Sequence, residues 1–186
     1  MTIQMSDFMY LGKKQYTLID IEKGKQIISC ATFVMPEHNG EIDLTTACWR
    51  GYTADYYVVK NMLYGVKSQT VIIDDGSKYG KAASLRSPRT MIPYTGSCII
   101  AYGDCFVSDF ITSYIDCKEA FELFFNQGVL KLKFTLISAI EKFFAVRETD
   151  EYKNKMEPYE RGQVLEEIAR GPLKYKYDCH TYKWRK

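Results

Sequence analysis

Alternating apolar and polar residues near the start of the chain predict a β-hairpin. Residues 9–11 and 16–18 each place apolar side chains at a spacing of two, on either side of Gly12-Lys13-Lys14. That spacing is typical of strands with one buried face, and the glycine suits a tight turn. A further apolar run, from Ile27 to Val34, ends at the turn-forming segment Pro36-Glu37-His38-Asn39-Gly40.

A second hairpin is predicted between residues 52 and 66. One face of its first strand carries Tyr52, Ala54, Tyr56 and Val58, and the other carries Thr53, Asp55 and Tyr57. Lys60-Asn61 follows, and asparagine tolerates the left-handed backbone of a two-residue turn. The segment from Met62 to Val66 therefore returns antiparallel to the first strand.

A third hairpin is predicted between residues 121 and 134. Apolar residues alternate from 121 to 125 and again from 130 to 134, around the turn Asn126-Gln127-Gly128. Lys131 and Lys133 alternate with the apolar positions of the second strand, so we expect them to face solvent.

The segment from Asp74 to Gly96 has no hydrophobic periodicity and predicts a long irregular loop. It follows a short β-branched run, Thr70 to Ile73, and carries Arg86 and Arg89 among Ser, Pro and Gly. Loops of this length are uncommon inside compact domains and are often functional. Two interpretations stay open, a binding loop and a solvated connection.

The periodicity becomes helical towards the C-terminus. Ile137, Ile140, Phe143 and Phe144 fit one helical face, and a second helix is predicted from about Pro158 to Arg170. Strands followed by helices indicate the α+β class, with an antiparallel, hairpin-built sheet that is either open or closed into a barrel-like form. We expect residues 1–186 to form one domain, with residues 172–186 as a basic aromatic tail.

Composition excludes several classes of protein. The chain has 186 residues, 46% of them hydrophobic and 26% charged, which suits a folded domain with a real core. Its net charge of +2 argues neither for nucleic acid nor for a membrane surface. Because no apolar run approaches the ~20 residues of a bilayer span and no signal peptide is recognisable, we expect a soluble cytoplasmic protein.

The six cysteines are expected to be structural free thiols rather than a disulfide framework, because nothing in the sequence indicates export. No cysteine pair has zinc-ligand spacing, and the two histidines, His38 and His180, are far apart. We therefore predict neither a metal nor a cofactor. The segment from Gly76 to Lys81 lacks the spacing of a phosphate-binding loop.

The densest cluster of chemistry-bearing residues is the segment from Thr46 to Tyr52. Cys48 is a candidate nucleophile, since Arg50 could lower the pKa of its thiol and His38 or His180 could serve as its base. The alternative is a thiol packed in the core, with Trp49, Arg50 and Tyr52 available for binding.

This segment, Thr46-Ala47-Cys48-Trp49-Arg50-Gly51-Tyr52, resembles the signature of a family of small uncharacterised bacterial proteins. A second block around residues 96–130 is also similar to that family. The chain departs from it at Ile115-Asp116-Cys117, where the family has His-Met-Gly. The resemblance implies a shared architecture and no particular activity.

The C-terminal tail combines five basic residues with one acidic residue and several aromatic rings. Such a composition suits stacking on bases or contact with an acidic partner, and it also suits an edge strand protected by lysines. The residues concerned are Lys174, Tyr175, Lys176, Tyr182 and Trp184.

Three functions stay open at this point. The leading hypothesis is a non-enzymatic module that binds another protein, such as a toxin or effector, because aromatic and basic residues are abundant and no catalytic set is recognisable. The alternatives are a Cys48-dependent hydrolase or transferase, and a nucleic-acid-binding protein that uses the basic loop and tail. Exposed strand edges are compatible with a homodimer.

Overall fold

A computed structural model describes most of the chain. The described residues are 7–21, 26–38, 40–42, 51–73, 75–77, 80–103, 117–157, 159–161, 163–164, 176–178 and 183–185. The strands are β1 (Phe8–Leu11), β2 (Lys14–Ile21), β3 (Glu41–Ile42), β4 (Thr53–Val59), β5 (Met62–Ile73), β6 (Lys81–Arg86), β7 (Thr90–Met91), β8 (Gly96–Tyr102), β9 (Glu119–Asn126), β10 (Val129–Thr135), β11 (Lys176–Asp178) and β12 (Lys183–Arg185). The helices are α1 (Ile137–Arg147), a 3-10 helix (Ile28–Cys30) and a π-helical turn (Glu151–Lys155).

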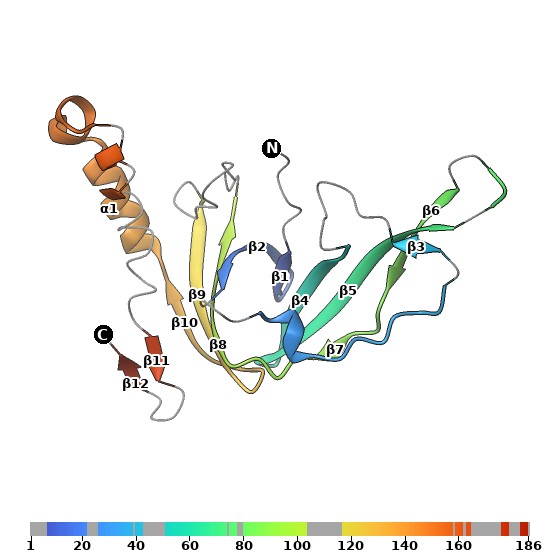
Figure 1. Ribbon diagram of the computed structural model, residues 1–186. Helices are drawn as coiled ribbons and strands as arrows, with labels where there is room; N and C mark the ends of the chain where they lie inside the picture. Colours follow the sequence, from blue (N-terminus) through green and yellow to red (C-terminus); the bar gives the residue numbers. More distant parts are fainter. Residues whose placement is uncertain are drawn as a thin grey trace.

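Ten strands form one strongly curved sheet (Figure 1), in the order β10-β9-β8-β2-β1-β4-β5-β3 with β6 and β7 also paired to β5. Every pairing is antiparallel except β1 with β4, which is parallel. One further bridge, Val129 with Met62, links β10 to β5. The α+β class with a mainly antiparallel sheet is confirmed, while closure into a barrel stays a prediction.

All three predicted hairpins are present, as β1–β2, β4–β5 and β9–β10. The turn of the second places Lys60 and Asn61 at φ 50° and 63°, and that of the third places Gln127 and Gly128 at 50° and 76°. Two successive residues with positive φ define the turn type whose twist matches that of paired strands. Local turn chemistry therefore sets the register of these hairpins.

The curved sheet packs its two faces differently. The inner face holds the main core, which includes Met9, Tyr16, Ala54, Tyr56, Leu63, Ile100, Leu123 and Phe125. On β8 and β9 the outer face is buried as well, because Ile99 and Ala101 pack with Leu136 and Ile140 at the start of α1. Helix α1 thus covers one end of the sheet and leaves the outer face of β1, β4 and β5 to other groups (Figure 1).

The prediction of a structureless loop from Asp74 to Gly96 is wrong. Strand β5 is twelve residues long and continues through the run from Thr70 to Ile73, and β6 and β7 pair with it. The segment Lys81–Arg86 has little hydrophobic alternation, so its sequence carries a weak strand signal. It forms a strand because the edge of β5 opposite β4 is open for pairing.

The cysteine prediction is confirmed for two residues and wrong for a third. Cys98 is fully buried and Cys30 partly buried, and both are free thiols. Cys117 is instead disulfide-bonded. Whether two cysteines pair depends on which of them the tertiary structure brings into bonding geometry, and residue spacing does not reveal that.

The helix predicted around residues 137–144 is confirmed as α1. Of the second predicted helix, residues 159–161 and 163–164 are helical, and residues 165–170 lie outside the described residues. In the tail, β11 pairs with β12 as a separate two-stranded sheet. Among the described residues, no helix combines the length and apolar character needed to cross a bilayer.

Candidate binding site

A row of three tyrosines crosses the outer face of the sheet. Tyr10 on β1 pairs with Tyr57 on β4, and Tyr57 pairs with Tyr64 on β5. Residues that are directly opposite across neighbouring strands point to the same face. Their neighbours Met9 and Tyr56 belong to the core, so alternation directs this tyrosine row away from it. All three tyrosines are half-buried.

The rings of the tyrosine row are ordered by stacking. The Tyr10 and Tyr57 ring centroids are 4.8 Å apart with an interplanar angle of 9°. The guanidinium carbon of Arg89 lies 4.2 Å from the centroid of the Tyr57 ring. Both groups therefore lie against the Tyr57 ring. Cation–π and ring stacking contacts of this kind hold the three side chains in one arrangement.

An ion pair borders the tyrosine row. Arg86 on β6 donates to Asp55 on β4 with an Nη2–Oδ2 distance of 2.7 Å. Partial burial raises the pKa of Asp55, against the lowering effect of Arg86. Burial also raises the pKa of Tyr10, with Asp55 adding to the effect. The Tyr10 phenol therefore stays protonated at neutral pH and keeps its hydrogen-bond donor.

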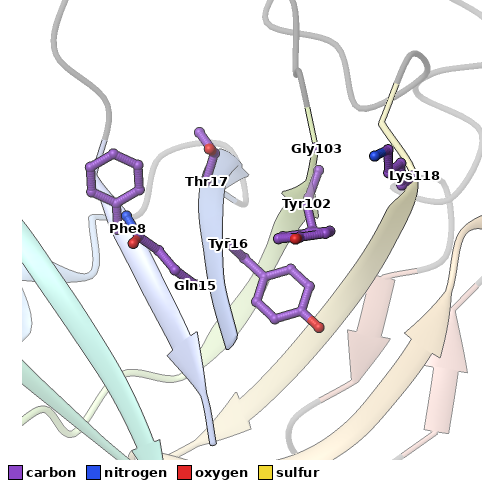
Figure 2. Close-up of a pocket in the computed structure, with 8 residues that line it drawn as sticks. Phe8, Gln15, Tyr16, Thr17, Tyr102, Gly103 and Lys118 are labelled. Atoms are coloured by element: carbon purple, nitrogen blue, oxygen red, sulfur yellow. The ribbon is translucent and has the colours of Figure 1, made fainter. Parts of the chain in front are cut away.

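A pocket lies beside the tyrosine row, towards β2 and β8. Its volume is about 350 Å³, and Phe8, Gln15, Tyr16, Thr17, Ala101, Tyr102, Gly103 and Lys118 line it (Figure 2). The register connects the two features, because Gln15 pairs with Tyr10 and Thr17 pairs with Phe8. The pocket and the tyrosine row thus form one continuous outer surface.

A polar cluster fixes the pocket wall from the inner side. The Tyr16 hydroxyl donates to Glu119 Oε2 at 2.9 Å, and Lys14 Nζ donates to the same oxygen at 2.8 Å. Lys14 also lies 3.9 Å from the centroid of the Tyr102 ring, which meets Tyr16 edge to face. The hydrogen bonds from Lys14 and Tyr16 lower the pKa of Glu119. Three adjacent strands are tied together at this point.

We expect the Tyr16 phenol to ionise later than an ordinary tyrosine. Burial, followed by the hydrogen bond to Glu119, raises its pKa from 10.0 to about 12. Since the unfolded chain loses this proton at lower pH than the fold, stability should fall as pH rises from about 10 to about 12. In ¹³C-tyrosine NMR at about pH 11, the Tyr16 Cζ resonance should still be that of a neutral phenol.

The control for this titration is Tyr16→Phe, which should remove the late-titrating resonance and flatten the alkaline stability slope. A Tyr16 Cζ resonance that has already reached the ionised position at about pH 11 would contradict the hydrogen-bonded arrangement.

The structure brings only part of the predicted binding set together. Arg86 and Arg89 lie at the tyrosine row. Tyr52 lies elsewhere, since its ring is 4.8 Å from the ammonium of Lys67, a residue that pairs with the core residue Ala54. His38 is exposed, with Nδ1 2.9 Å from the carbonyl oxygen of Gly40.

The remaining predicted site residues cannot be placed. Cys48, Trp49, Arg50, Lys174, Tyr175 and Tyr182 lie outside the described residues. Lys176 and Trp184 are on β11 and β12, where the structure describes the backbone alone. Within the described part of the chain, no group of three or more His, Cys, Asp or Glu residues could hold a metal ion.

Sequence reasoning missed Tyr10, Tyr64 and the pocket residues. One signal was present: Tyr57 shares the face of Asp55, opposite the core residue Tyr56. An aromatic residue on the polar face of a strand is a candidate for binding. The parallel pairing that brings Tyr10 to Tyr57 joins two separate hairpins, and no local sequence pattern predicts it.

Comparison with protein-family models, with curated proteins and with solved structures found no match to this chain. The resemblance of residues 46–52 to a bacterial family stays a prediction. Function is therefore inferred from the side chains of the tyrosine row and of the pocket.

Proposed function

We propose that this protein is a non-enzymatic binding module that holds an acidic segment of another protein on the tyrosine row. The observation that carries the proposal is the ordered set of Tyr10, Tyr57 and Arg89 on the outer face of the sheet. Tyrosine and arginine are the residues most enriched among the energetically dominant contacts of protein interfaces. Tyrosine also supplies a large rigid contact area at low cost in conformational entropy.

The charges of the tyrosine row favour an acidic partner. Arg86 is neutralised by Asp55, whereas Arg89 has no ion-pair partner among the described residues. A carboxylate from a partner would reach a guanidinium that is already held in place by a ring. Pre-organised arginine loses little further entropy on binding, and its planar fork suits a carboxylate.

The same geometry makes protein a better candidate than single-stranded nucleic acid. Proteins that bind single strands offer open ring faces on which bases stack. Here the central ring, that of Tyr57, is already in contact with the Tyr10 ring and the Arg89 guanidinium. The phenol hydroxyls and ring edges remain for a partner, and these suit the polar groups of a peptide.

The test uses the full-length purified protein and a displayed library of random peptides. We expect peptides rich in Asp and Glu to be enriched on the wild-type protein. Tyr57→Ala should lower the affinity for the enriched peptides by about thirtyfold, as expected for a central tyrosine. Arg89→Ala should lower this affinity by about tenfold, which corresponds to the loss of one charge-assisted contact.

Two exposed residues away from the tyrosine row serve as matched controls. Tyr159→Ala and Lys81→Ala remove an aromatic ring and a cation, respectively, and should leave peptide affinity unchanged. Thermal unfolding of each variant separates loss of binding from loss of fold. Equal binding of the enriched peptides to the wild-type protein and to both tyrosine-row variants would overturn the proposal.

A dT15 oligonucleotide tests the nucleic-acid alternative in the same assay. We expect no binding to it at physiological salt. Binding that falls steeply with salt and depends on Tyr57 and Arg89 would replace the protein partner with a nucleic acid. The Cys48-dependent hydrolase or transferase stays a prediction, because its central residue lies outside the described residues.

A further inference from the structure

The pocket beside the tyrosine row has rigid walls. Phe8 is positioned by Asp7, whose carbonyl oxygen accepts from Leu18 N and whose Oδ1 accepts from Ala54 N, both at 2.9 Å. On the opposite side, Lys118 N donates to Tyr102 O at 2.9 Å. These contacts connect β1, β2, β4 and β8, so the pocket does not depend on a bound molecule for its shape.

The walls combine an aromatic ring with polar groups. Phe8, Gln15 and Thr17 share the outer face of β1 and β2, whereas the Tyr102 ring lies beside the Tyr16 ring (Figure 2). The amide of Gln15 and the hydroxyl of Thr17 can each donate or accept a hydrogen bond. A volume of about 350 Å³ lies within the range of small-molecule sites. A ligand of this size would contact the Phe8 ring and polar groups at the same time.

Among the described residues that line the pocket, Lys118 carries the one formal charge, which is positive. Lys118 is exposed and lies at the pocket, and it has no ion-pair partner among the described residues. Among the described residues that line the pocket there is no carboxylate. The neighbouring Glu119 does not compensate Lys118, because its carboxylate is held by Lys14 and Tyr16.

We propose that this pocket binds a small planar anion, an aromatic ring that carries a carboxylate or a phosphate group. The ring packs against Phe8, and the anionic group pairs with the ammonium of Lys118. Gln15 and Thr17 orient the ligand through hydrogen bonds. This site uses a different cation from the tyrosine row and does not depend on the proposed protein partner.

The experiment is a titration of the ¹⁵N-labelled full-length protein with phenyl phosphate, followed by NMR. We expect the amide resonances of Gln15, Thr17, Gly103 and Lys118 to shift together. Benzyl alcohol, which lacks the charge, and inorganic phosphate, which lacks the ring, should each bind at least tenfold more weakly. Equal binding of either one would overturn the proposal, as would shifts confined to residues elsewhere.

Variants identify the groups that bind the ligand. Lys118→Gln should lower the affinity for phenyl phosphate about tenfold and leave the affinity for benzyl alcohol unchanged. Lys131→Gln, at an exposed lysine on β10, should change neither affinity. Thr17→Trp should fill the pocket and abolish binding, since tryptophan is well tolerated on a strand. Unchanged affinity in both Lys118→Gln and Thr17→Trp would refute the site.

Arg89→Ala separates the two proposals. It should weaken peptide binding at the tyrosine row and leave phenyl phosphate binding unchanged. Loss of phenyl phosphate binding in this variant would contradict a separate site at Lys118. Failure of the peptide experiment alone would leave the result of the phenyl phosphate titration intact.

Discussion

Replacement of Gly128 by alanine is expected to destabilise the protein by about 3–5 kcal/mol, as the sum of backbone strain and a steric clash. Gly128 has φ +76°, and a Cβ there would lie 2.3 Å from the carbonyl oxygen of Ile92. The neighbouring backbone cannot move away easily. Gly128 N donates to Tyr94 O, and Gly128 O accepts from Leu63 N, both at 2.8 Å.

Gly12→Ala is the matched control for Gly128→Ala. Gly12 also has a positive φ, +64°, but a Cβ at this position meets nothing within 4 Å. Its substitution should therefore cost only the strain of a non-glycine residue at positive φ, about 1–2 kcal/mol of stability. Denaturant unfolding of both variants, at unchanged m-value, measures the difference. Equal destabilisation of the two variants would show that the Ile92 carbonyl moves away from the added Cβ at little cost in free energy.

Leu63→Ala is expected to cost about 3 kcal/mol, within the range of about 2–5 kcal/mol for buried leucines. The Leu63 side chain is 0% exposed and belongs to the main core. Its backbone joins two other segments, since Leu63 N donates to Gly128 O and Leu63 O accepts from Ile92 N. The backbone bonds persist in the variant, so the neighbouring chain cannot collapse fully into the cavity.

Val59→Ala provides the comparison within the same hairpin. Val59 is 43% exposed and pairs with Met62 at the turn. We expect its substitution to change stability by no more than about 0.5 kcal/mol. Urea unfolding followed by tryptophan fluorescence and circular dichroism measures both variants. A cost for Leu63→Ala below about 1 kcal/mol would mean that the core around β5 repacks without loss.

Arg89 illustrates how the fold gives a residue its role. In the sequence it belongs to a polar segment without periodicity, where a cation in a solvated loop is the ordinary expectation. In the structure this segment is anchored on both sides, by β6 and by β7, to the long strand β5. That anchoring carries the Arg89 guanidinium to the ring of Tyr57. A loop residue thereby becomes part of an ordered surface.

Local chemistry was sufficient to predict the three hairpins and helix α1. Alternation at a spacing of two, Asn61 and Gly128 in their turns, and the helical spacing from residue 137 are all properties of a few consecutive residues. The alternation also placed Asp55 and Tyr57 on the face of β4 opposite Tyr56, as the structure has them. These features follow from the sequence because they involve no distant partner.

Contacts between distant segments required the tertiary structure. The parallel pairing of β1 with β4 joins separate hairpins and creates the tyrosine row, and the open edge of β5 opposite β4 turns an aperiodic segment into β6. The pocket beside Lys118 likewise depends on segments far apart in the chain. Pairing between distant strands is set by packing of the whole core and not by local periodicity. The sequence alone therefore determined the hairpins and which of their residues share a face, and only the tertiary structure decided which outward side chains meet to form a binding surface.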